Sequence, residues 1–160
     1  MIRPATFEDI PAILRIFDIA RSFMRENGNP TQWIGYPAEE HVRADIAKGA
    51  CYVLDDQGVH AVFSLFSDPD PTYKYIEDGA WPNEAPYGTI HRIASDGTRR
   101  GVVRQAVDFA LQFHSVLRCD THKDNLPMQR ALIGAGFVRC GIIYLENGDP
   151  REAFWRGETC

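Results

Sequence analysis

Tyr87-Gly88-Thr89-Ile90-His91-Arg92-Ile93-Ala94-Ser95 is the stretch around which the rest of the chain is organised. Its β-branched and apolar residues, gathered after a glycine, predict a strand. The basic stretch 96–101 (Asp-Gly-Thr-Arg-Arg-Gly) is rich in turn residues, and apolar residues recur at helical spacing over 102–114. The sequence therefore predicts a strand, a loop with glycines and arginines, and a helix, in that order.

A strand followed by a loop with glycines and arginines and then by a helix is a common arrangement for binding phosphate. Unpaired N–H groups in the first turn of a helix and the helix dipole favour an anion there. Arg99 and Arg100 add forked donors beside that end. The nucleotide-binding fingerprints are absent, because no Gly-Lys-Ser/Thr follows and because Gly97 and Gly101 lack the remaining glycine spacing. An ordinary strand-to-helix connection with solvated arginines is the alternative.

Composition is that of an ordinary globular chain. Its 160 residues, 44% apolar and 24% charged, predict a single domain over 1–160. We expect a cytoplasmic protein without a membrane partner, because we find neither a signal core nor an apolar run of about 20 residues. Cys51, Cys119, Cys140 and Cys160 lie far apart, which predicts reduced thiols and no metal site. The net charge of −5 argues against nucleic acid as a partner and is compatible with a cationic small substrate.

Hydrophobic periodicity and turn residues predict the order of the elements. Thr6 is expected to cap the first helix, which runs to about Arg25. The order predicts an α/β or α+β domain around one mixed sheet. The expected strands are 1–4, 50–54, 59–66, 87–95, 115–121, 137–145 and 152–155, and the further helices are 38–48, 102–114 and one that begins near 124.

Two aromatic segments are candidates for substrate contact. The loop 31–37 (Thr-Gln-Trp-Ile-Gly-Tyr-Pro) is predicted to be either a lid over a pocket or a packed connector. The acidic and aromatic segment 72–85 suits contact with a cation, or is an exposed loop with a few packed aromatic rings. Trp33, Tyr36 and Tyr73 are the candidate substrate-binding residues.

Two motifs resemble those of the GCN5-related N-acetyltransferase (GNAT) superfamily, and the resemblance covers nearly the whole chain. The segment 91–103 is similar to the family's strand and its Gln/Arg-x-x-Gly-x-Gly/Ala loop, which cradles the pyrophosphate of acetyl-CoA. The segment 120–128 is similar to the second motif, in which an Asn stands eleven and twelve residues before a Gly-Phe pair, here Asn125 before Gly136 and Phe137. Two helices ahead of the sheet and a final hairpin agree with this resemblance.

Three positions depart from the family pattern. Thr98 stands where the family has Gln or Arg, and Val103 where it has Gly or Ala. Leu132, seven residues after Asn125, stands where the family often has a Tyr that protonates the departing thiolate. This chain therefore cannot use that tyrosine.

The resemblance implies a single mixed, mostly antiparallel sheet with a splayed parallel strand pair and flanking helices, and acetyl-CoA as cosubstrate. Pantetheine would lie where the strands ending at Ser95 and Asp120 separate. Its carbonyls would pair with the backbone of the strand that ends at Ser95, and the basic loop would bind the pyrophosphate. Asn125 would bind pantetheine from the other side. The implied cofactor-binding residues are Ile93, Ala94, Ser95, Arg99, Arg100, Gly101, Val102, Val103, Arg104 and Asn125.

The reaction that the resemblance implies is acetyl transfer to the primary amine of a small-molecule acceptor by direct attack on the thioester. An alkyl amine is mostly charged at pH 7, so a base would help. His91, Asp120 and His122 are the candidate catalytic residues, with Glu77 and Tyr144 in reserve. Each also has a structural interpretation, such as a strand histidine satisfied by a neighbour or an Asp that caps the next helix. Cys119 is expected to be a core thiol rather than a nucleophile.

Two other classes of function remain open. Leu132 and the irregular phosphate loop favour a non-catalytic acyl-CoA sensor, and an unrelated nucleotide-binding domain is a third interpretation. A homodimer is also left open.

Overall fold

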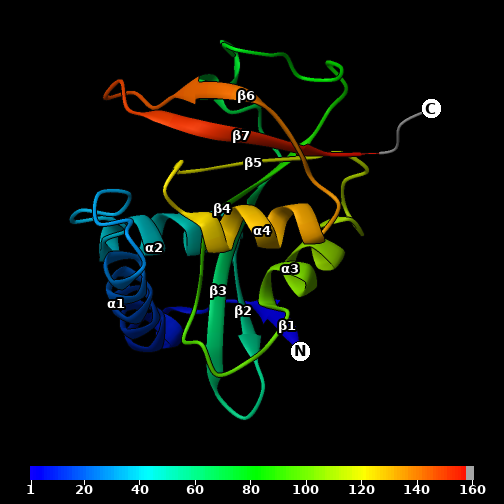
Figure 1. Cartoon of the computed structure of the whole chain (residues 1–160). Helices are drawn as coiled ribbons and strands as arrows, with labels where there is room; N and C mark the ends of the chain where they lie inside the picture. Colours follow the sequence, from blue (N-terminus) through cyan, green and yellow to red (C-terminus); the bar gives the residue numbers. More distant parts are fainter. Residues whose placement is uncertain (158–160) are drawn as a thin grey trace. The chain divides into compact units, whose positions relative to one another are not determined.

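The computed structural model describes residues 1–157 (Figure 1). Its elements follow the predicted order, with one-turn 3-10 helices added at 7–9 and 71–73. Cys51, Cys119 and Cys140 are free and buried, as expected, whereas Cys160 lies outside the described residues. The elements are β1 (Ile2–Pro4), α1 (Ile10–Glu26), α2 (Glu39–Ala47), β2 (Cys51–Asp55), β3 (Val59–Phe66), β4 (Gly88–Ser95), α3 (Val102–Ala110), β5 (Leu117–Thr121), α4 (Leu126–Gly134), β6 (Val138–Tyr144) and β7 (Pro150–Arg156).

The strands form a seven-stranded sheet in the order β1-β2-β3-β4-β5-β7-β6. β1 and β2, β2 and β3, β5 and β7, and β6 and β7 pair antiparallel, whereas β4 and β5 pair parallel. This confirms the predicted mixed, mostly antiparallel sheet with one parallel pair. By its internal contacts the chain divides into a first unit, residues 1–65 and 91–102, and a second unit, residues 66–90 and 103 onward. The expectation of one domain stays a prediction.

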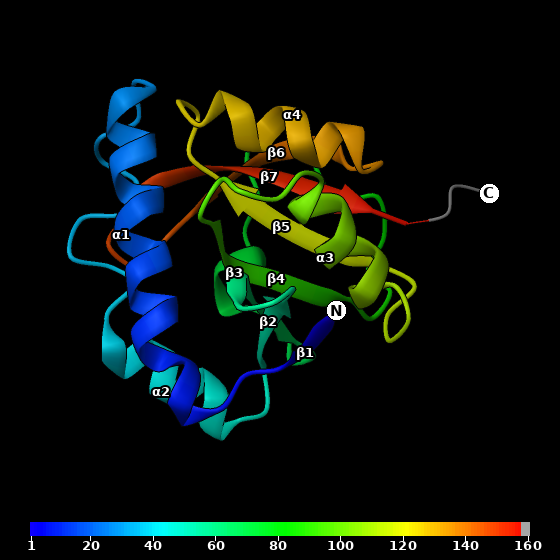
Figure 2. The ribbon, with the colours of Figure 1, turned by 90° about the horizontal axis from the view of Figure 1, so that it is seen from below.

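The first unit is built on the apolar face of α1. Ile13, Ile16, Phe17 and Ala20 recur at helical spacing and pack in one cluster with Val53 of β2 and other core residues. Burial of each large apolar side chain contributes about 1.5–3 kcal/mol. Figure 2 shows α1 next to α2 within this unit. The chain enters α1 through a short turn that fixes where the helix begins.

Thr6 stands at the N-cap position of that turn, but its side chain makes no cap hydrogen bond. The Thr6 N–H donates to Asp9 Oδ2 at 2.8 Å, and the two guanidinium ends of Arg3 donate to the same carboxylate at 2.9 Å. The hydrogen bonds from Arg3 hold the pKa of Asp9 below its usual range. The predicted start of the first helix is confirmed, although its first turn is a 3-10 turn.

The second unit has its own core under the long segment 67–87. Tyr73 and Trp81 of that segment are buried with Ile143 and Trp155 of the terminal hairpin. The backbones of Glu77 and Ile142 pair antiparallel, which attaches the segment to β6. α4 lies alongside the strands of this unit in Figure 1, and Arg156 Nε donates to Ala135 O at 2.9 Å.

Gly79 marks a close approach within this unit. Its φ is +150°, and a Cβ placed there would lie 1.9 Å from the carbonyl oxygen of Cys140. Only glycine fits against that backbone. The segment 67–87 is therefore seated on β6 by contacts that leave no space for a side chain.

One regular pattern and one predicted bound differ from the structure. In a strictly alternating strand Cys140 and Ile143 would lie on opposite faces, but along β6 both are buried in the same cluster. The pairing of β6 with β7 shifts between Arg139 and Gly141, and such a bulge resets the alternation of faces. α3 also ends at Ala110 instead of continuing to 114, and Phe113 is 61% exposed.

No helix within the described part of the chain combines the length and the apolar character that crossing a membrane requires.

Candidate functional site

The parallel pairing of β4 with β5 ends early. Its register contains only Gly88 with Leu117 and Thr89 with Arg118. β5 then continues to Thr121 while it pairs with β7 along its other edge. Cys119 Sγ donates to Ile90 O at 3.5 Å, so a side chain meets this carbonyl just beyond the last parallel pair. An extended ligand that carries amides can satisfy strand groups at such a place.

β4 itself is kinked at Arg92, whose φ is +53°. A non-glycine residue with this backbone conformation inside a strand costs about 1–3 kcal/mol and needs support from its surroundings. It also breaks the regular alternation of N–H and C=O directions along the strand. The backbone groups of Ile93 and Ala94 come directly after this kink. They are the groups that the superfamily resemblance predicts to contact an acyl thioester.

The support for the kink comes from side chains of the first unit. Arg92 Nε and Nη2 each donate to the Asp45 carboxylate at 2.7 Å, and Arg92 Nη1 donates to the Tyr36 hydroxyl at 2.6 Å. Ser64 Oγ donates to Asp45 Oδ2 at 2.7 Å. Burial acts to lower the pKa of Arg92, but the hydrogen bonds to Asp45 outweigh it and raise that pKa overall. The pair is largely desolvated, with side-chain exposures of 17% for Arg92 and 6% for Asp45.

The predicted phosphate loop is held by turns and one exposed ion pair. The Thr98 N–H donates to Asp96 Oδ1 at 2.9 Å, and Asp96 Oδ2 lies 2.8 Å from His60 Nδ1. Arg99 Nε donates to Asp56 Oδ2 at 2.7 Å, which lowers the pKa of Asp56. Arg99 thus already has a carboxylate partner, and an incoming phosphate would compete with it.

The other loop residues are placed as follows. Gly101 has a φ of +69°, with no atom within 4 Å of the position of a Cβ, so glycine suits the turn that leads into α3. Arg100 is exposed, and Val102 and Val103 are partly exposed at the start of α3. Arg104, the next residue of α3, donates to the carbonyl oxygen of Gly134 in α4.

Within the second unit, the structure brings two predicted residues together. The Tyr73 hydroxyl donates to Asp120 Oδ2 at 2.6 Å. Tyr73 is 1% exposed, and burial raises its pKa well above the ordinary value, so the ring keeps its proton. Asp120 is half-buried near the end of β5. The Tyr73 hydroxyl therefore orients the Asp120 carboxylate.

The remaining predicted catalytic and cofactor residues have local structural contacts. His122 Nδ1 accepts the Asp124 N–H at 3.0 Å, and burial lowers the pKa of this imidazole. Asn125 caps α4, because its side-chain oxygen accepts the Met128 N–H at 3.2 Å. His91 is half-buried in β4. The structure therefore brings the predicted residues Asp120 and Tyr73 into contact.

Trp33 and Tyr36 lie in the first unit and not with Tyr73. Trp33 packs against the α1 core, with its ring edge-on to Phe17 at 5.5 Å between centroids. Tyr36 lies 6.3 Å from the Trp33 ring and 4.8 Å from the ring of His41. These contacts are typical of a packed connector, one of the two interpretations of this loop. A role in substrate binding stays a prediction for all three aromatic residues.

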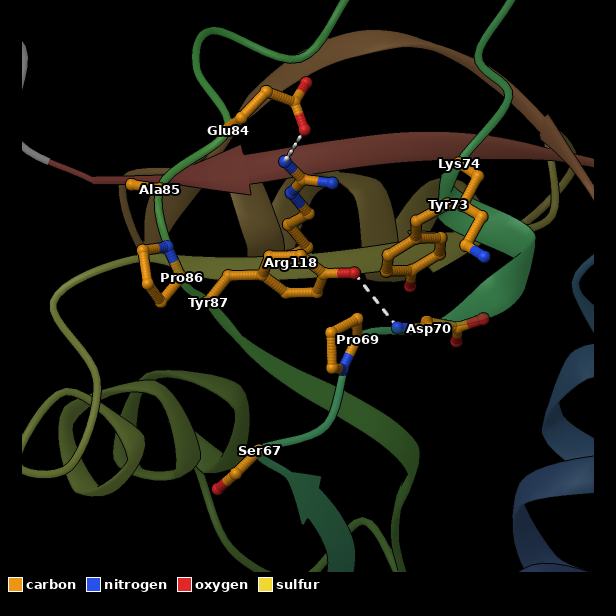
Figure 3. A pocket seen from close by; sticks show the side chains of 10 residues that line it. All are labelled: Ser67, Pro69, Asp70, Tyr73, Lys74, Glu84, Ala85, Pro86, Tyr87 and Arg118. Atoms are coloured by element: carbon orange, nitrogen blue, oxygen red, sulfur yellow. Dashed lines mark hydrogen bonds and ion pairs between the residues drawn. The ribbon is translucent and has the colours of Figure 1, made fainter.

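A cavity that the sequence did not predict lies within the second unit (Figure 3). Its volume is about 460 Å³, and Tyr73 and Arg118 are part of its wall. Arg118 is only 3% exposed although it carries a charge. The available signal was an arginine inside the otherwise apolar strand 116–119, because charged residues are almost never fully buried without a partner. The full lining is Ser67, Pro69, Asp70, Tyr73, Lys74, Glu84, Ala85, Pro86, Tyr87 and Arg118.

Comparison with known proteins bears on the fold. No family model matches the sequence, and neither does any curated protein. A GNAT-family acetyltransferase from Streptococcus agalactiae 2603 has a similar structure, with a TM-score of 0.89 and 26% identity over 100% of this chain and 96% of that chain. A GNAT-family acetyltransferase from Listeria monocytogenes 4b F2365 has a TM-score of 0.70 and 19% identity, with 98% and 93% covered.

A third similar structure is the aminoglycoside acetyltransferase AAC(6')-Ib in complex with coenzyme A and kanamycin. Its TM-score is 0.66 and its identity 18%, over 99% of this chain and 94% of that chain. At that identity the likeness bears on the fold alone. Together, the sheet, the parallel pair that ends early and the similar structures define an acetyltransferase fold. The chain belongs to the GCN5-related N-acetyltransferase superfamily.

Proposed function

We propose that this protein transfers the acetyl group of acetyl-CoA to the primary amine of a small-molecule acceptor. The observation that carries the proposal is the early end of the β4–β5 pairing, followed along the chain by the kink at Arg92 and the glycine-bearing basic loop. These features stand in the order in which the superfamily motifs require them. The coenzyme A bound to AAC(6')-Ib, a protein of the same fold, supports acetyl-CoA as cosubstrate.

The residues present fit such a cosubstrate. From the first unit, the backbone of Ile93 to Ser95 would pair with pantetheine, and the loop 99–101 would bind phosphate through its N–H groups. Arg104 and Asn125, which lie in the second unit, stay cofactor residues predicted from the resemblance alone. Arg99 would exchange its exposed partner Asp56 for phosphate at small cost, because exposed ion pairs contribute only about 0–1 kcal/mol.

Acetyl-CoA would supply the acetyl group as an activated thioester, and the chain's own residues would manage protons and charge. Asp120 would accept the proton of the acceptor ammonium, and the Tyr73 hydrogen bond would keep the carboxylate oriented. A backbone N–H near Ala94 would stabilise the oxyanion. With Leu132 in place of a tyrosine, the sulfur would take its proton from another donor.

Cys119 does not enter this scheme. It is fully enclosed in the core, and burial raises the pKa of its thiol far above neutrality. A protonated thiol is a poor nucleophile. Direct attack by the amine requires no covalent enzyme intermediate, so the buried thiol has no role in the transfer.

The test is release of free thiol from acetyl-CoA with pooled primary amines. We expect turnover by the native protein and a loss of about 100-fold in kcat/KM for Asp120→Asn, the size typical of a general base. Asp108→Asn is the matched control, because Asp108 is exposed on α3. His91→Ala tests one of the two other candidate bases, His91 and His122, since an unchanged pH–rate profile would remove His91. Full activity of Asp120→Asn would contradict the assignment of Asp120.

Leu132 favours one alternative, a non-catalytic acyl-CoA sensor. Such a sensor would bind coenzyme A in a titration but release no thiol with any amine. A nucleotide-binding domain of another kind would bind nucleotides that lack the pantetheine arm equally well. The same titration and the same assay therefore separate all three.

A further inference from the structure

Arg118 is a buried charge that lacks a close carboxylate partner. Its side chain is 3% exposed, and the nearest acidic group is Glu84, 4.0 Å away and itself 90% exposed. Arg118 Nη2 donates to Asn83 O at 3.1 Å, whereas Nε has no hydrogen-bond partner among residues 1–157. A guanidinium has five N–H donors, and burying them unpaired is costly. The protein therefore holds a cation whose hydrogen-bonding capacity is mostly unused.

Aromatic rings hold this guanidinium in place. Arg118 Cζ lies 4.1 Å from the centroid of the Trp81 ring and 4.0 Å from that of Tyr87. The Tyr87 hydroxyl accepts the Asp70 N–H at 3.0 Å, and Trp81 Nε1 donates to Tyr73 O at 2.9 Å. Both rings are thus fixed, and the guanidinium between them is oriented without any ion pair at hydrogen-bond distance.

The cavity gives access to this group. Figure 3 shows the Arg118 side chain rising beside the Tyr87 ring, with one terminal nitrogen toward Glu84 and the other toward the space near Tyr73 and Lys74. Lys74 adds a second positive charge to the lining. A volume of about 460 Å³ lies in the range of small-molecule sites.

We infer that this cavity binds a carboxylate of the acetyl acceptor, so that the acceptor is an amine that also carries a carboxylate, as an amino acid does. This inference rests on the proposed function. A planar carboxylate matches the forked donors of a guanidinium and supplies the charge that Arg118 lacks. A purely cationic acceptor fits less well, because Arg118 already covers the Trp81 and Tyr87 rings that would attract a cation.

The position of Arg118 relative to Asp120 agrees with this class of acceptor. Residues two apart on a strand point to the same face, about 7 Å from each other. Tyr73 belongs to the cavity wall and also donates to Asp120. A cationic anchor and a proton acceptor at this spacing suit a short molecule with a carboxylate near its amine.

The experiment compares matched acceptors that differ only in the carboxylate. The pairs are L-leucine with 3-methylbutylamine, L-phenylalanine with 2-phenylethylamine, and L-lysine with 1,5-diaminopentane. We expect the native protein to prefer at least one amino acid over its decarboxylated amine by about 10- to 100-fold in kcat/KM, the size of one charge-assisted pair. Arg118→Met should abolish this preference, because it removes the guanidinium that distinguishes the two members of each pair.

Two further variants control for folding. Arg118→Lys keeps the charge but loses the fork, so it should retain only part of the preference even if Arg118→Met does not fold. Arg15→Met removes an arginine from the exposed face of α1 and should leave the preference unchanged. Calorimetric titration of the native protein and of each variant with the amino acids alone measures carboxylate binding without turnover.

The outcomes separate this inference from the proposed function. Turnover without any preference for the carboxylate overturns the inference and leaves acetyl transfer standing. Amino-acid binding that Arg118→Lys weakens, without thiol release by any acceptor, supports the carboxylate site and overturns the proposed function. Absence of both binding and preference for all three amino acids overturns the inference.

Discussion

Arg92 of the first unit is partly buried and Arg118 of the second is fully buried, and the two arginines are stabilised differently. Arg92 shares two hydrogen bonds of 2.7 Å with the Asp45 carboxylate. Arg118 has two aromatic rings and a carbonyl oxygen instead. Burial lowers the pKa of Arg118 because no close carboxylate offsets it, whereas the Asp45 pair raises the pKa of Arg92 in spite of burial.

The difference suggests separate roles for the two residues. A buried charge whose partner belongs to the same chain is already neutralised in the folded protein. Such a pair can hold the backbone in place, as it does here at the kink of β4. A buried charge without such a partner is incomplete and is suited to a ligand that brings the opposite charge.

The largest effect is expected for Asp45→Asn. This change leaves Arg92 buried without its counter-charge, and we expect a loss of about 3 kcal/mol in the free energy of unfolding, measured by urea denaturation. Arg118→Met, which replaces an incompletely paired charge by an apolar chain, should cost less than about 1.5 kcal/mol. If Arg118→Met were as costly as Asp45→Asn, Arg118 would be a structural residue and the comparison would fail.

Gly79→Ala should have the next largest effect. The new Cβ would meet the carbonyl oxygen of Cys140, so the segment 67–87 must shift, and we expect a loss of about 2 kcal/mol. Gly101→Ala is the matched control in the first unit. No atom lies near the new Cβ there, so only the positive φ opposes the alanine, and we expect a loss of about 1 kcal/mol. Thermal unfolding of both variants measures the difference. Equal losses of stability for the two variants would mean that the close contact at Gly79 adds nothing to the cost of the backbone conformation.

A smaller effect is expected from pH. The pKa of Asp9 is lowered in the folded state by its hydrogen bonds to Arg3, so the folded protein binds a proton here less readily than the unfolded chain. The resulting stability is present above about pH 4–5 and is lost as pH falls through the folded pKa.

Asp9→Asn should therefore reduce the loss of stability between pH 5 and 3, seen in urea midpoints at each pH. Asp18→Asn is the control, because Asp18 is 76% exposed on α1 and pairs with Arg21. An unchanged pH dependence in Asp9→Asn would show that the Arg3–Asp9 pair does not contribute to acid stability.

The smallest effect is expected for Cys119→Ala. The buried thiol keeps its proton, so thiol release from acetyl-CoA should stay within about twofold of the native rate. The thermal unfolding temperature of the same sample separates a loss of fold from a loss of chemistry. A well-folded but inactive variant would make Cys119 part of the reaction and contradict direct attack by the amine.

The sequence by itself determined the order of the elements, the start of α1 and the superfamily motifs. These features depend on local patterns, such as apolar periodicity, the Thr6–Asp9 hydrogen bond and the spacing from Asn125 to Gly136. The bulge in β6 could not be predicted, because it depends on how Cys140 and Gly141 meet the backbone of residues 77–79. Short-range alternation carries no information about such a contact.

Only the tertiary structure decided which charges are paired. Asp45 and Arg92 stand 47 residues apart, as do Tyr73 and Asp120, and no local pattern links them. The burial of Arg118 between Trp81 and Tyr87 likewise results from the packing of the segment 67–87 onto β5 and β6. Electrostatic roles depend on distance and burial, and both are set when remote parts of the chain pack together.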